Sequence, residues 1–193
     1  MEESKNTYDR RTLKTRKAIK DALCELLVEK ELHKVTVKEI TDKADINRGT
    51  FYKHYLDVFD LYDKMEHDIL IDLGMLVLEL ESLRSEQFFK HLIDYIDDNR
   101  PEFRMMFSPN STCKLRDRFN RILEGLFRQL EAEEIEANIS DITLRYHTNY
   151  RSRGCTAVIG LWARGNFVEP KEFIIKNLCA LDSNTKSFIL KNK

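Results

Sequence analysis

The chain has 193 residues, of which 42% are hydrophobic, so it can bury a core as one compact domain or as a small domain joined to a larger one. Its formal net charge of -1 gives no overall indication of a nucleic-acid partner. That average conceals an asymmetry, because residues 1–56 carry 13 basic and 10 acidic side chains, whereas the remainder carries 19 and 23. Basic charge is densest in RRTLKTRKAIK, residues 10–20, a segment that is either simply exposed or in contact with an acidic partner.

Cysteine usage and hydropathy exclude several classes of protein. The four cysteines form no CxxC pair and have no histidine at ligand spacing, so we expect reduced thiols and no metal site. The segment MEESKNTYDRRT lacks the apolar core of a signal peptide. The most apolar run, residues 69–80, is too short to span a membrane and contains Asp72 and Glu79. We therefore expect a cytoplasmic protein with no membrane partner.

The spacing of apolar residues predicts an all-α fold. A first helix is expected over about residues 10–30, where an apolar stripe recurs at helical spacing and requires a packing partner. Thr36, followed three residues later by Glu39, forms the sequence pattern of a capping box and predicts a second helix that begins at Val37 and ends near Asp45.

A third short helix is expected from about Arg48 to His54, and Asp57 can cap a long fourth helix that runs towards residue 80. The rest of the chain also reads as helical. Further helices are predicted at residues 86–98, 100–107, 114–135 and 141–165, and after Pro170.

Three short helices, with about three residues between the second and third, are the outline of a helix-turn-helix module. Such a module places its last helix in the major groove of DNA, with polar side chains at the helix N-terminus and an apolar back face. Phe51 and Tyr55 suit the back face. The predicted DNA-binding residues are Thr36, Asn47, Arg48, Gly49, Thr50, Tyr52, Lys53 and His54.

Each of these residues has an expected role. Asn47, Arg48 and Thr50 would meet base edges or phosphates, and Gly49 would let the backbone approach DNA closely. Tyr52, Lys53 and His54 would reach phosphates, and Thr36 would provide a phosphate seat at a helix N-terminus. That list defines the expected interface.

The stretch RGTFYKHY, residues 48–55, resembles the recognition helix of the TetR family of bacterial transcriptional regulators. Asp60 and Leu61 match the acidic-leucine pair that commonly begins the next helix of that family. A weaker similarity lies in residues 150–173, where glycine, isoleucine, tryptophan and proline recur as in the family's two terminal helices.

Three positions depart from the family pattern. Asp45 stands in the turn where glycine is usual, which is tolerable because aspartate enters the left-handed region more readily than most residues. Thr41 replaces a usual alanine, and Val58 stands where many members have a phosphate-contacting lysine. We therefore expect the contact at position 58 to be absent.

The resemblance implies a DNA-binding domain over residues 8–56 and a helical dimerisation and effector-binding domain over 57–193. It implies a repressor that binds double-stranded operator DNA as a homodimer and is released by a small-molecule effector. Nothing in the sequence suggests an enzyme or a cofactor. The alternative function is an all-α interaction protein that keeps the scaffold and has lost specific DNA binding.

Two features of the C-terminal part bear on these functions. A stripe of small and apolar residues in the penultimate helix predicts a dimer seam with the helix after Pro170, since small residues let helices approach closely. The stripe comprises Gly154, Ala157, Gly160 and Leu161. Tyr146, Tyr150 and Trp162 are candidates for the lining of an effector cavity, and the alternative is that these aromatic residues belong to the core.

Overall fold

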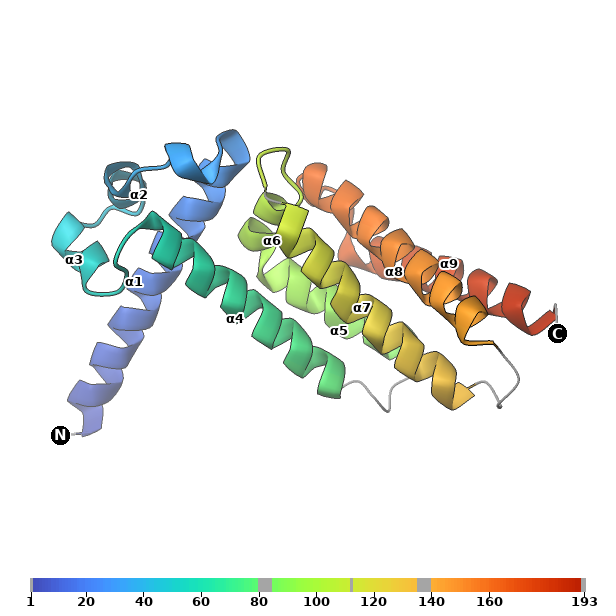
Figure 1. The fold of residues 1–193 in the computed structure, drawn as a ribbon. Coiled ribbons are helices and arrows are strands. Elements are labelled where there is room, and N and C mark those ends of the chain that lie inside the picture. The colour runs from blue at the N-terminus through green and yellow to red at the C-terminus, as the bar shows by residue number, and fades with distance from the viewer. Residues whose placement is uncertain (1, 80–84, 112, 135–139, 192–193) are drawn as a thin grey trace.

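The computed structural model describes residues 2–79, 85–111, 113–134 and 140–191, and the described residues contain helices and no β-strand (Figure 1). The predicted all-α fold is confirmed. In chain order the elements are α1 (Glu2–Glu29), the 3-10 turn η1 (Leu32–Lys34), α2 (Val37–Lys43), α3 (Arg48–Tyr52), α4 (Val58–Glu79), α5 (Ser85–Asp98), α6 (Arg100–Met106), α7 (Cys113–Glu134), α8 (Asp141–Arg164) and α9 (Lys171–Lys191).

Three helix boundaries differ by two or more residues from those expected, and one of them is the end of α2 at Lys43 rather than near Asp45. Helix α1 begins at Glu2 rather than near residue 10, because the polar N-terminal segment contains no proline or glycine to end the helix. Helix α3 ends at Tyr52, two residues before the predicted end at His54. In Figure 1 the first turns of α1 project beyond the other helices.

Helices α1 to α3 and the start of α4 form a small unit at one end of the molecule, and α5 to α9 form a bundle at the other (Figure 1). The small unit closes around fully buried apolar side chains from all four helices. These side chains include Ile19, Leu23, Ile40, Phe51 and Leu61, each 0% exposed. Burial of this apolar surface is the main stabilising contribution to a unit of this size.

Aromatic rings fill the core of the C-terminal bundle. Phe88 and Phe89 of α5 pack together with their centroids 5.1 Å apart, and Phe88 meets Phe127 of α7 at 6.0 Å. Phe103 of α6 meets Phe119 of α7 edge to face at 5.8 Å. Such contacts add to the free energy of simple area burial, so α5, α6 and α7 are packed firmly against one another.

The loop between α6 and α7 connects the bundle to the end of α1. Ser108 Oγ donates to the carbonyl of Leu27 at 3.3 Å, and Asn110 Nδ2 donates to the carbonyl of Val28 at 2.9 Å. The last carbonyls of a helix have no partner within the helix. Side chains of the C-terminal part therefore satisfy the end of the first helix of the N-terminal part.

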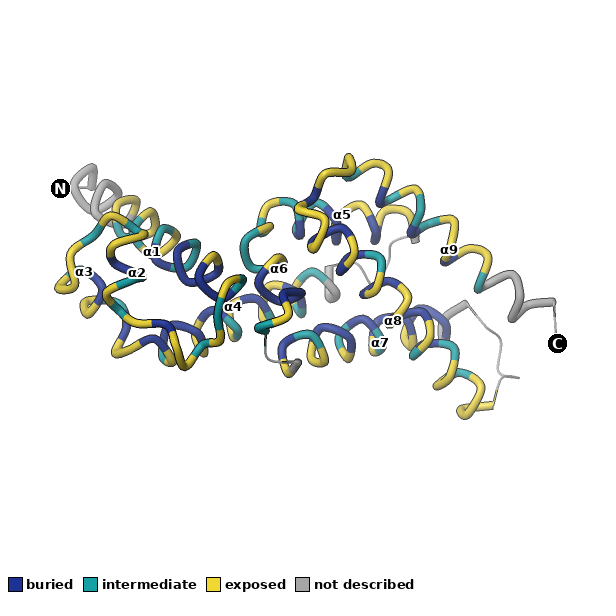
Figure 2. Tube along the Cα trace, turned by 90° about the horizontal axis from the view of Figure 1, so that it is seen from above, coloured by how far each residue is buried: buried dark blue, intermediate teal, exposed yellow. Residues whose placement is uncertain are grey.

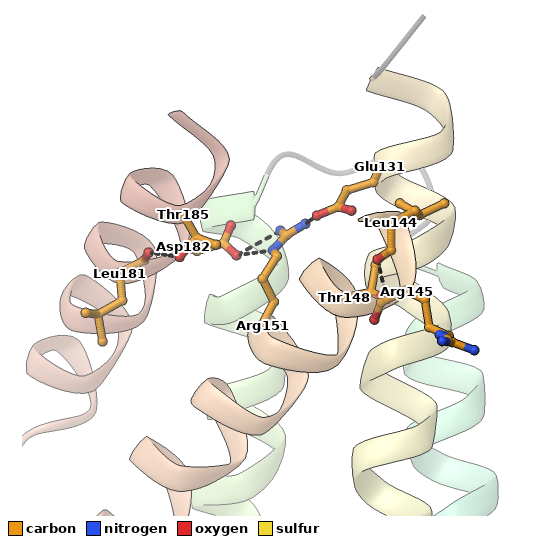
Figure 3. Close-up of polar contacts among 8 residues, drawn as sticks. All are labelled: Glu131, Leu144, Arg145, Thr148, Arg151, Leu181, Asp182 and Thr185. Atoms are coloured by element: carbon orange, nitrogen blue, oxygen red, sulfur yellow. Dashed lines mark hydrogen bonds and ion pairs between the residues drawn. The ribbon is translucent and has the colours of Figure 1, made fainter. Parts of the chain in front are cut away.

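A buried group of three charged side chains joins α7, α8 and α9 (Figure 3). Arg151 of α8 donates from Nη1 to Glu131 Oε1 at 2.5 Å and from Nε to Asp182 Oδ1 at 2.8 Å. Its guanidinium carbon also lies 4.2 Å from the centroid of the Phe127 ring. The side chain of Arg151 is 1% exposed and those of its two partners are 2% exposed, so solvent screens these interactions only weakly.

Within the ranges that the structure describes, no helix has both the length and the apolar character needed to cross a membrane.

Candidate nucleic-acid interface

The N-terminus of α2 is closed by the capping box predicted from the sequence. Thr36 Oγ1 accepts from the Glu39 amide at 3.3 Å, and the Thr36 amide donates to Glu39 Oε2 at 3.0 Å. The Thr36 hydroxyl also donates to Glu39 Oε2 at 2.9 Å, and Lys30 binds the other oxygen. The hydrogen bond from Lys30, followed by those from Thr36, lowers the pKa of Glu39 to about 2.

These bonds alter the expected role of Thr36. Both donors of this residue, its amide and its hydroxyl, are already engaged with the Glu39 carboxylate. A phosphate could receive them only by displacing that carboxylate. The sequence indicated the capping box but not this competition, because the spacing of Thr36 and Glu39 does not show that Lys30 holds the carboxylate in place.

The turn between α2 and α3 depends on one left-handed residue. Asp45 has a φ of 52°, as its place in a usual glycine position suggested. The following amide, that of Ile46, donates back to the carbonyl of Thr41 at 3.0 Å. The Thr41 side chain is buried and donates to the carbonyl of Lys38 at 3.0 Å. Threonine thus fits the small space at this position without leaving its hydroxyl unsatisfied.

Asn47 is the N-cap of α3. Its Oδ1 accepts from the Thr50 amide at 2.8 Å and from the Thr50 hydroxyl at 2.9 Å. Substitution of an N-cap by alanine costs about 0.5–2 kcal/mol. Asn47 therefore fixes the first turn of α3 through its Oδ1, and none of these bonds uses its Nδ2. The Thr50 hydroxyl has donated its hydrogen to Asn47, so it can only accept a further hydrogen bond.

Exposure divides α3 into an outer and an inner face. Arg48, Gly49, Tyr52 and Lys53 are exposed, with Tyr52 57% exposed, and α3 lies at the outer end of the molecule (Figure 2). Phe51 is 0% exposed and packs against Tyr55, with the two centroids 5.7 Å apart. The predicted inward position of both aromatic rings is confirmed.

Gly49 has no packing partner that requires a glycine. A Cβ atom at this position would meet only Asn47 Oδ1, at an ordinary contact distance of 3.4 Å. The backbone dihedral of Gly49 is not in the left-handed region. The missing side chain therefore affects what can approach from outside, rather than how the protein itself packs.

His54 follows Lys53, the C-cap of α3. Its side chain is half buried, and burial, followed by the charges of Arg16 and Lys53, lowers the pKa of His54 below its ordinary 6.5. The lowered pKa favours the neutral ring, which can donate one hydrogen bond. The charge of Arg16, from the basic run of α1, therefore acts on His54.

The other basic side chains of residues 10–20 lie in different environments. Lys20 is held by Asp68 of α4 at 2.6 Å, which ties α1 to α4. Arg10, Arg11 and Lys14 are exposed on the projecting part of α1. The sequence showed that this segment is basic. It did not show that Lys20 pairs with α4 while Arg10, Arg11 and Lys14 are exposed.

Val58 lies at the start of α4. This side chain is 6% exposed and belongs to the core, so it faces away from any external ligand. Asp57 caps the helix by accepting from the Asp60 amide at 2.8 Å. Asp60 in turn accepts from the Leu56 amide at 2.9 Å and pairs with Lys64. The acidic residue of the pair at positions 60 and 61 therefore fixes the connection between α3 and α4.

The three aromatic candidates for an effector cavity do not meet. Tyr146 and Tyr150 are 67% and 69% exposed, and both line a surface pocket between α8 and α9. Trp162 is 1% exposed, and its Nε1 donates to the carbonyl of Glu169 at 2.9 Å. Its ring packs edge to face on Phe167, with centroids 4.9 Å apart. Trp162 therefore belongs to the core, as the alternative interpretation held.

The stripe expected to form a dimer seam is also divided. Gly154, Ala157 and Leu161 are exposed on α8, with Leu161 70% exposed. Gly160 instead faces inward, where an added Cβ would lie 2.7 Å from Phe107 Cδ1. Successive residues of a helix point about 100° apart, which explains why neighbouring positions 160 and 161 lie on different faces.

A capped helix, a tight left-handed turn and a second short helix with an exposed polar face define a helix-turn-helix DNA-binding protein. Comparison with known proteins agrees with this class. Residues 19–57 match the model described as "Bacterial regulatory proteins, tetR family", and residues 84–183 match "Transcriptional regulator C-terminal region". The chain belongs to the TetR family of bacterial transcriptional regulators, whose members are not enzymes.

One curated relative is an uncharacterized HTH-type transcriptional regulator, YxbF, of Bacillus subtilis (strain 168), which is 24% identical over 183 residues. The match covers 91% of this chain and 46% of the relative, so the chain spans about half the length of that protein.

Solved structures share the fold at low sequence identity. The dihydroxyacetone kinase operon activator DhaS is 18% identical with a TM-score of 0.60, and the match covers 86% of this chain and 93% of DhaS. NalD, the secondary repressor of the MexAB-OprM multidrug efflux pump in Pseudomonas aeruginosa, is 18% identical with a TM-score of 0.57. That match covers 90% of this chain and 97% of NalD.

Proposed function

We propose that this chain is a cytoplasmic transcriptional repressor that binds operator DNA as a homodimer and is released by a small-molecule effector. The exposed outer face of α3 is the observation that carries the proposal. This face presents the side chains of Arg48, Tyr52 and Lys53, and the absence of a side chain at Gly49 leaves space beside them. On the opposite face of the helix, Phe51 is buried in the core. The alternative, an interaction protein on the same scaffold, would bind no duplex sequence in preference to another.

The roles within this face follow from chemistry. Arg48 has five donors in a planar fork and matches the two acceptors of a guanine edge in the major groove. Lys53 is the C-cap of α3 and offers a single ammonium, which suits a phosphate. Asn47 and Phe51 hold the helix, while Thr36 can join a phosphate only after Glu39 releases it. Residues 8–56 would form the reading head and residues 57–193 the domain that pairs two heads.

An apolar face of the C-terminal part supports a dimer. Exposed large apolar side chains occur along α8 and α9, on the surface away from the core. They are Ile142, Tyr146, Tyr150 and Leu161 of α8, and Phe173 and Leu181 of α9. Contiguous exposed apolar surface marks an interaction site, and a second copy of the chain would cover it with the same face by twofold symmetry.

Two reading heads are needed because one five-residue recognition helix contacts few bases. Half-sites on one face of DNA lie about 34–36 Å apart, so a change of a few ångströms in the separation of the heads would prevent both from docking. This is how an effector would release the protein. Repression, rather than activation, is proposed from the family resemblance, and transcription of a reporter joined to the operator, with and without the protein, tests it.

DNA binding is tested with the duplex upstream of the gene that encodes this chain and with a random duplex, each across a series of salt concentrations. Arg48→Ala should lose about 1–3 kcal/mol on the cognate duplex and far less on the random one. Lys53→Ala should weaken both equally and lower the slope of the salt dependence by about one. Arg121→Ala, on the exposed surface of α7, is the matched control and should change neither. Equal binding of the two duplexes by the wild type would favour the interaction protein.

The dimer is tested by sedimentation velocity of the wild type and of Leu161→Glu. The wild type should have twice the mass of one chain, and the charged variant should dissociate because it buries a carboxylate in an apolar seam. Ile71→Glu introduces the same charge on the exposed face of α4 and should remain dimeric. A monomeric wild type contradicts this part of the proposal.

A further inference from the structure

A cavity of about 350 Å³ lies where the end of α1 meets α6 and the turn between α8 and α9. Figure 1 shows the C-terminal end of α1 beside α6 at this point. The volume is within the range of small-molecule sites. The cavity lies at the junction of the DNA-binding part and the C-terminal part. It is separate from the pocket lined by Tyr146 and Tyr150, which lies on the proposed dimer face.

The two long walls of this junction cavity carry opposite charges. Helix α1 contributes Glu25 and Glu29, and helix α6 contributes Arg100 and Arg104. Two of these groups already have partners, because Glu25 pairs with Lys43 at 2.8 Å and Arg100 Nε donates to Asp97 Oδ1 at 2.9 Å. Glu29 contributes only through its charge to the environment of Lys43, and Arg104 is the fourth group.

Glu29 and Arg104 make no ion pair or side-chain hydrogen bond with any residue that the structure describes. They line the same cavity from opposite helices and do not pair with each other. A carboxylate and a guanidinium that face one cavity without meeting are complementary to a ligand that carries both an ammonium and a carboxylate.

Between the charged walls the lining is apolar. Val28 of α1, Pro101 of α6 and Phe167 after α8 all contribute to it. Phe167 is 6% exposed, and the guanidinium carbon of Arg100 lies 5.4 Å from its ring centroid. A ligand with an apolar side group would contact this lining while its charges faced the walls.

The turn that lines one end of the cavity has an uncommon backbone. Asn166 and Phe167 are consecutive residues with φ of 58° and 55°, both in the left-handed region. That region is unfavourable for a bulky side chain such as phenylalanine. The turn ends α8, since the Phe167 amide donates to the carbonyl of Trp162 at 2.9 Å, and it sets Phe167 at the edge of the cavity.

From these observations we propose that the junction cavity binds a zwitterionic α-amino acid with an apolar side chain. The ligand's carboxylate pairs with Arg104, its ammonium pairs with Glu29, and its side chain packs on Val28, Pro101 and Phe167. A bound ligand bridges α1 to α6 and fixes the reading head against the bundle. This consequence for DNA rests on the proposed function, whereas ligand binding itself does not.

The test is isothermal titration calorimetry of the full chain without DNA. The probes are L-leucine, L-isoleucine, L-valine, L-methionine and L-phenylalanine. At least one should bind at one molecule per chain. The matched probes for leucine are 4-methylpentanoate, which lacks the ammonium, and 3-methylbutylamine, which lacks the carboxylate. Each single-charge analogue of a binding amino acid should bind at least about tenfold more weakly, because one charge-assisted hydrogen bond is lost.

Variants then locate the site. Arg104→Gln and Glu29→Gln remove exposed charges that no described contact uses, so both should fold normally and bind at least about tenfold more weakly. Arg121→Gln on α7 should bind as the wild type does. The proposal is wrong if none of the five amino acids binds, if the single-charge analogues bind equally well, or if the two cavity variants keep full affinity. Because no DNA is present, failure here leaves the proposed operator binding untouched.

Discussion

The buried charges of Arg151, Glu131 and Asp182 allow a sharp test of what holds α7, α8 and α9 together (Figure 3). Arg151→Met keeps most of the apolar stem and removes the guanidinium. It would leave two carboxylates in a site where the charged side chains are only 1–2% exposed. Removing one partner of a buried pair costs about 3–5 kcal/mol, and here one guanidinium serves two carboxylates. We therefore expect a loss at the upper end of that range.

The triple variant Arg151→Met, Glu131→Met, Asp182→Leu separates two explanations of that loss. If the cost arises from unpaired buried charges, replacing all three groups by apolar ones should recover most of the stability. If the cost arises from lost packing of the arginine stem on Phe127, the triple variant should be no more stable than the single one.

The assay is urea denaturation followed by circular dichroism, with every variant at the same protein concentration because a dimer unfolds in a concentration-dependent way. Arg121→Met on the exposed face of α7 is the control and should lie within about 0.5 kcal/mol of the wild type. A loss below about 1 kcal/mol for Arg151→Met would refute the reasoning from unpaired buried charge.

Three further predictions concern single side chains. Phe51→Ala should lower the free energy of unfolding by about 3–5 kcal/mol, measured by urea denaturation, because the ring is 0% exposed and anchors α3. The pKa of Glu39 is lowered from 4.5 to about 2, so its contribution to stability is present above pH 4.5 and is lost as the pH falls towards 2. Thermal melts at a series of pH values measure this loss. Between pH 4.5 and pH 2 the melting temperature should fall further for the wild type than for Glu39→Gln. Gly160→Ala should lower the free energy of unfolding by about 1–3 kcal/mol, because the added Cβ would lie 2.7 Å from Phe107. Gly125 has open space around it, so Gly125→Ala should not destabilise the protein in the same denaturation assay.

Local sequence patterns predicted the features that depend on neighbours in the chain. The spacing of Thr36 and Glu39 identified the capping box, because the hydrogen bonds of a helix N-terminus join residues three apart. The choice of aspartate at position 45 agreed with a left-handed turn. The alternation of polar and aromatic residues over 48–55 placed Phe51 and Tyr55 inside, since that pattern fits one buried face of a short helix.

Features that depend on distant parts of the chain were not predictable in this way. Glu131, Arg151 and Asp182 each resemble ordinary surface residues of a helix, and only the packing of three helices brings them together. Gly160 and Leu161 were assigned to one stripe, although their neighbouring positions place them on different faces of α8. Trp162 was a candidate for a cavity together with Tyr146 and Tyr150, and the alternative placed these aromatic residues in the core. Its Nε1 donates to the carbonyl of Glu169, a contact made across the turn after α8.

The hydrogen bonds from Ser108 and Asn110 to the last turn of α1 bear on how such proteins can be recombined. A reading head transplanted onto an unrelated sensor would lose the two donors that complete its first helix, unless the recipient supplied equivalents. The short loop after α6 therefore belongs with the head as much as with the bundle. A chimera designed with that loop inherited from the donor protein should fold more cooperatively than one cut at residue 57, where the sequence alone places the boundary.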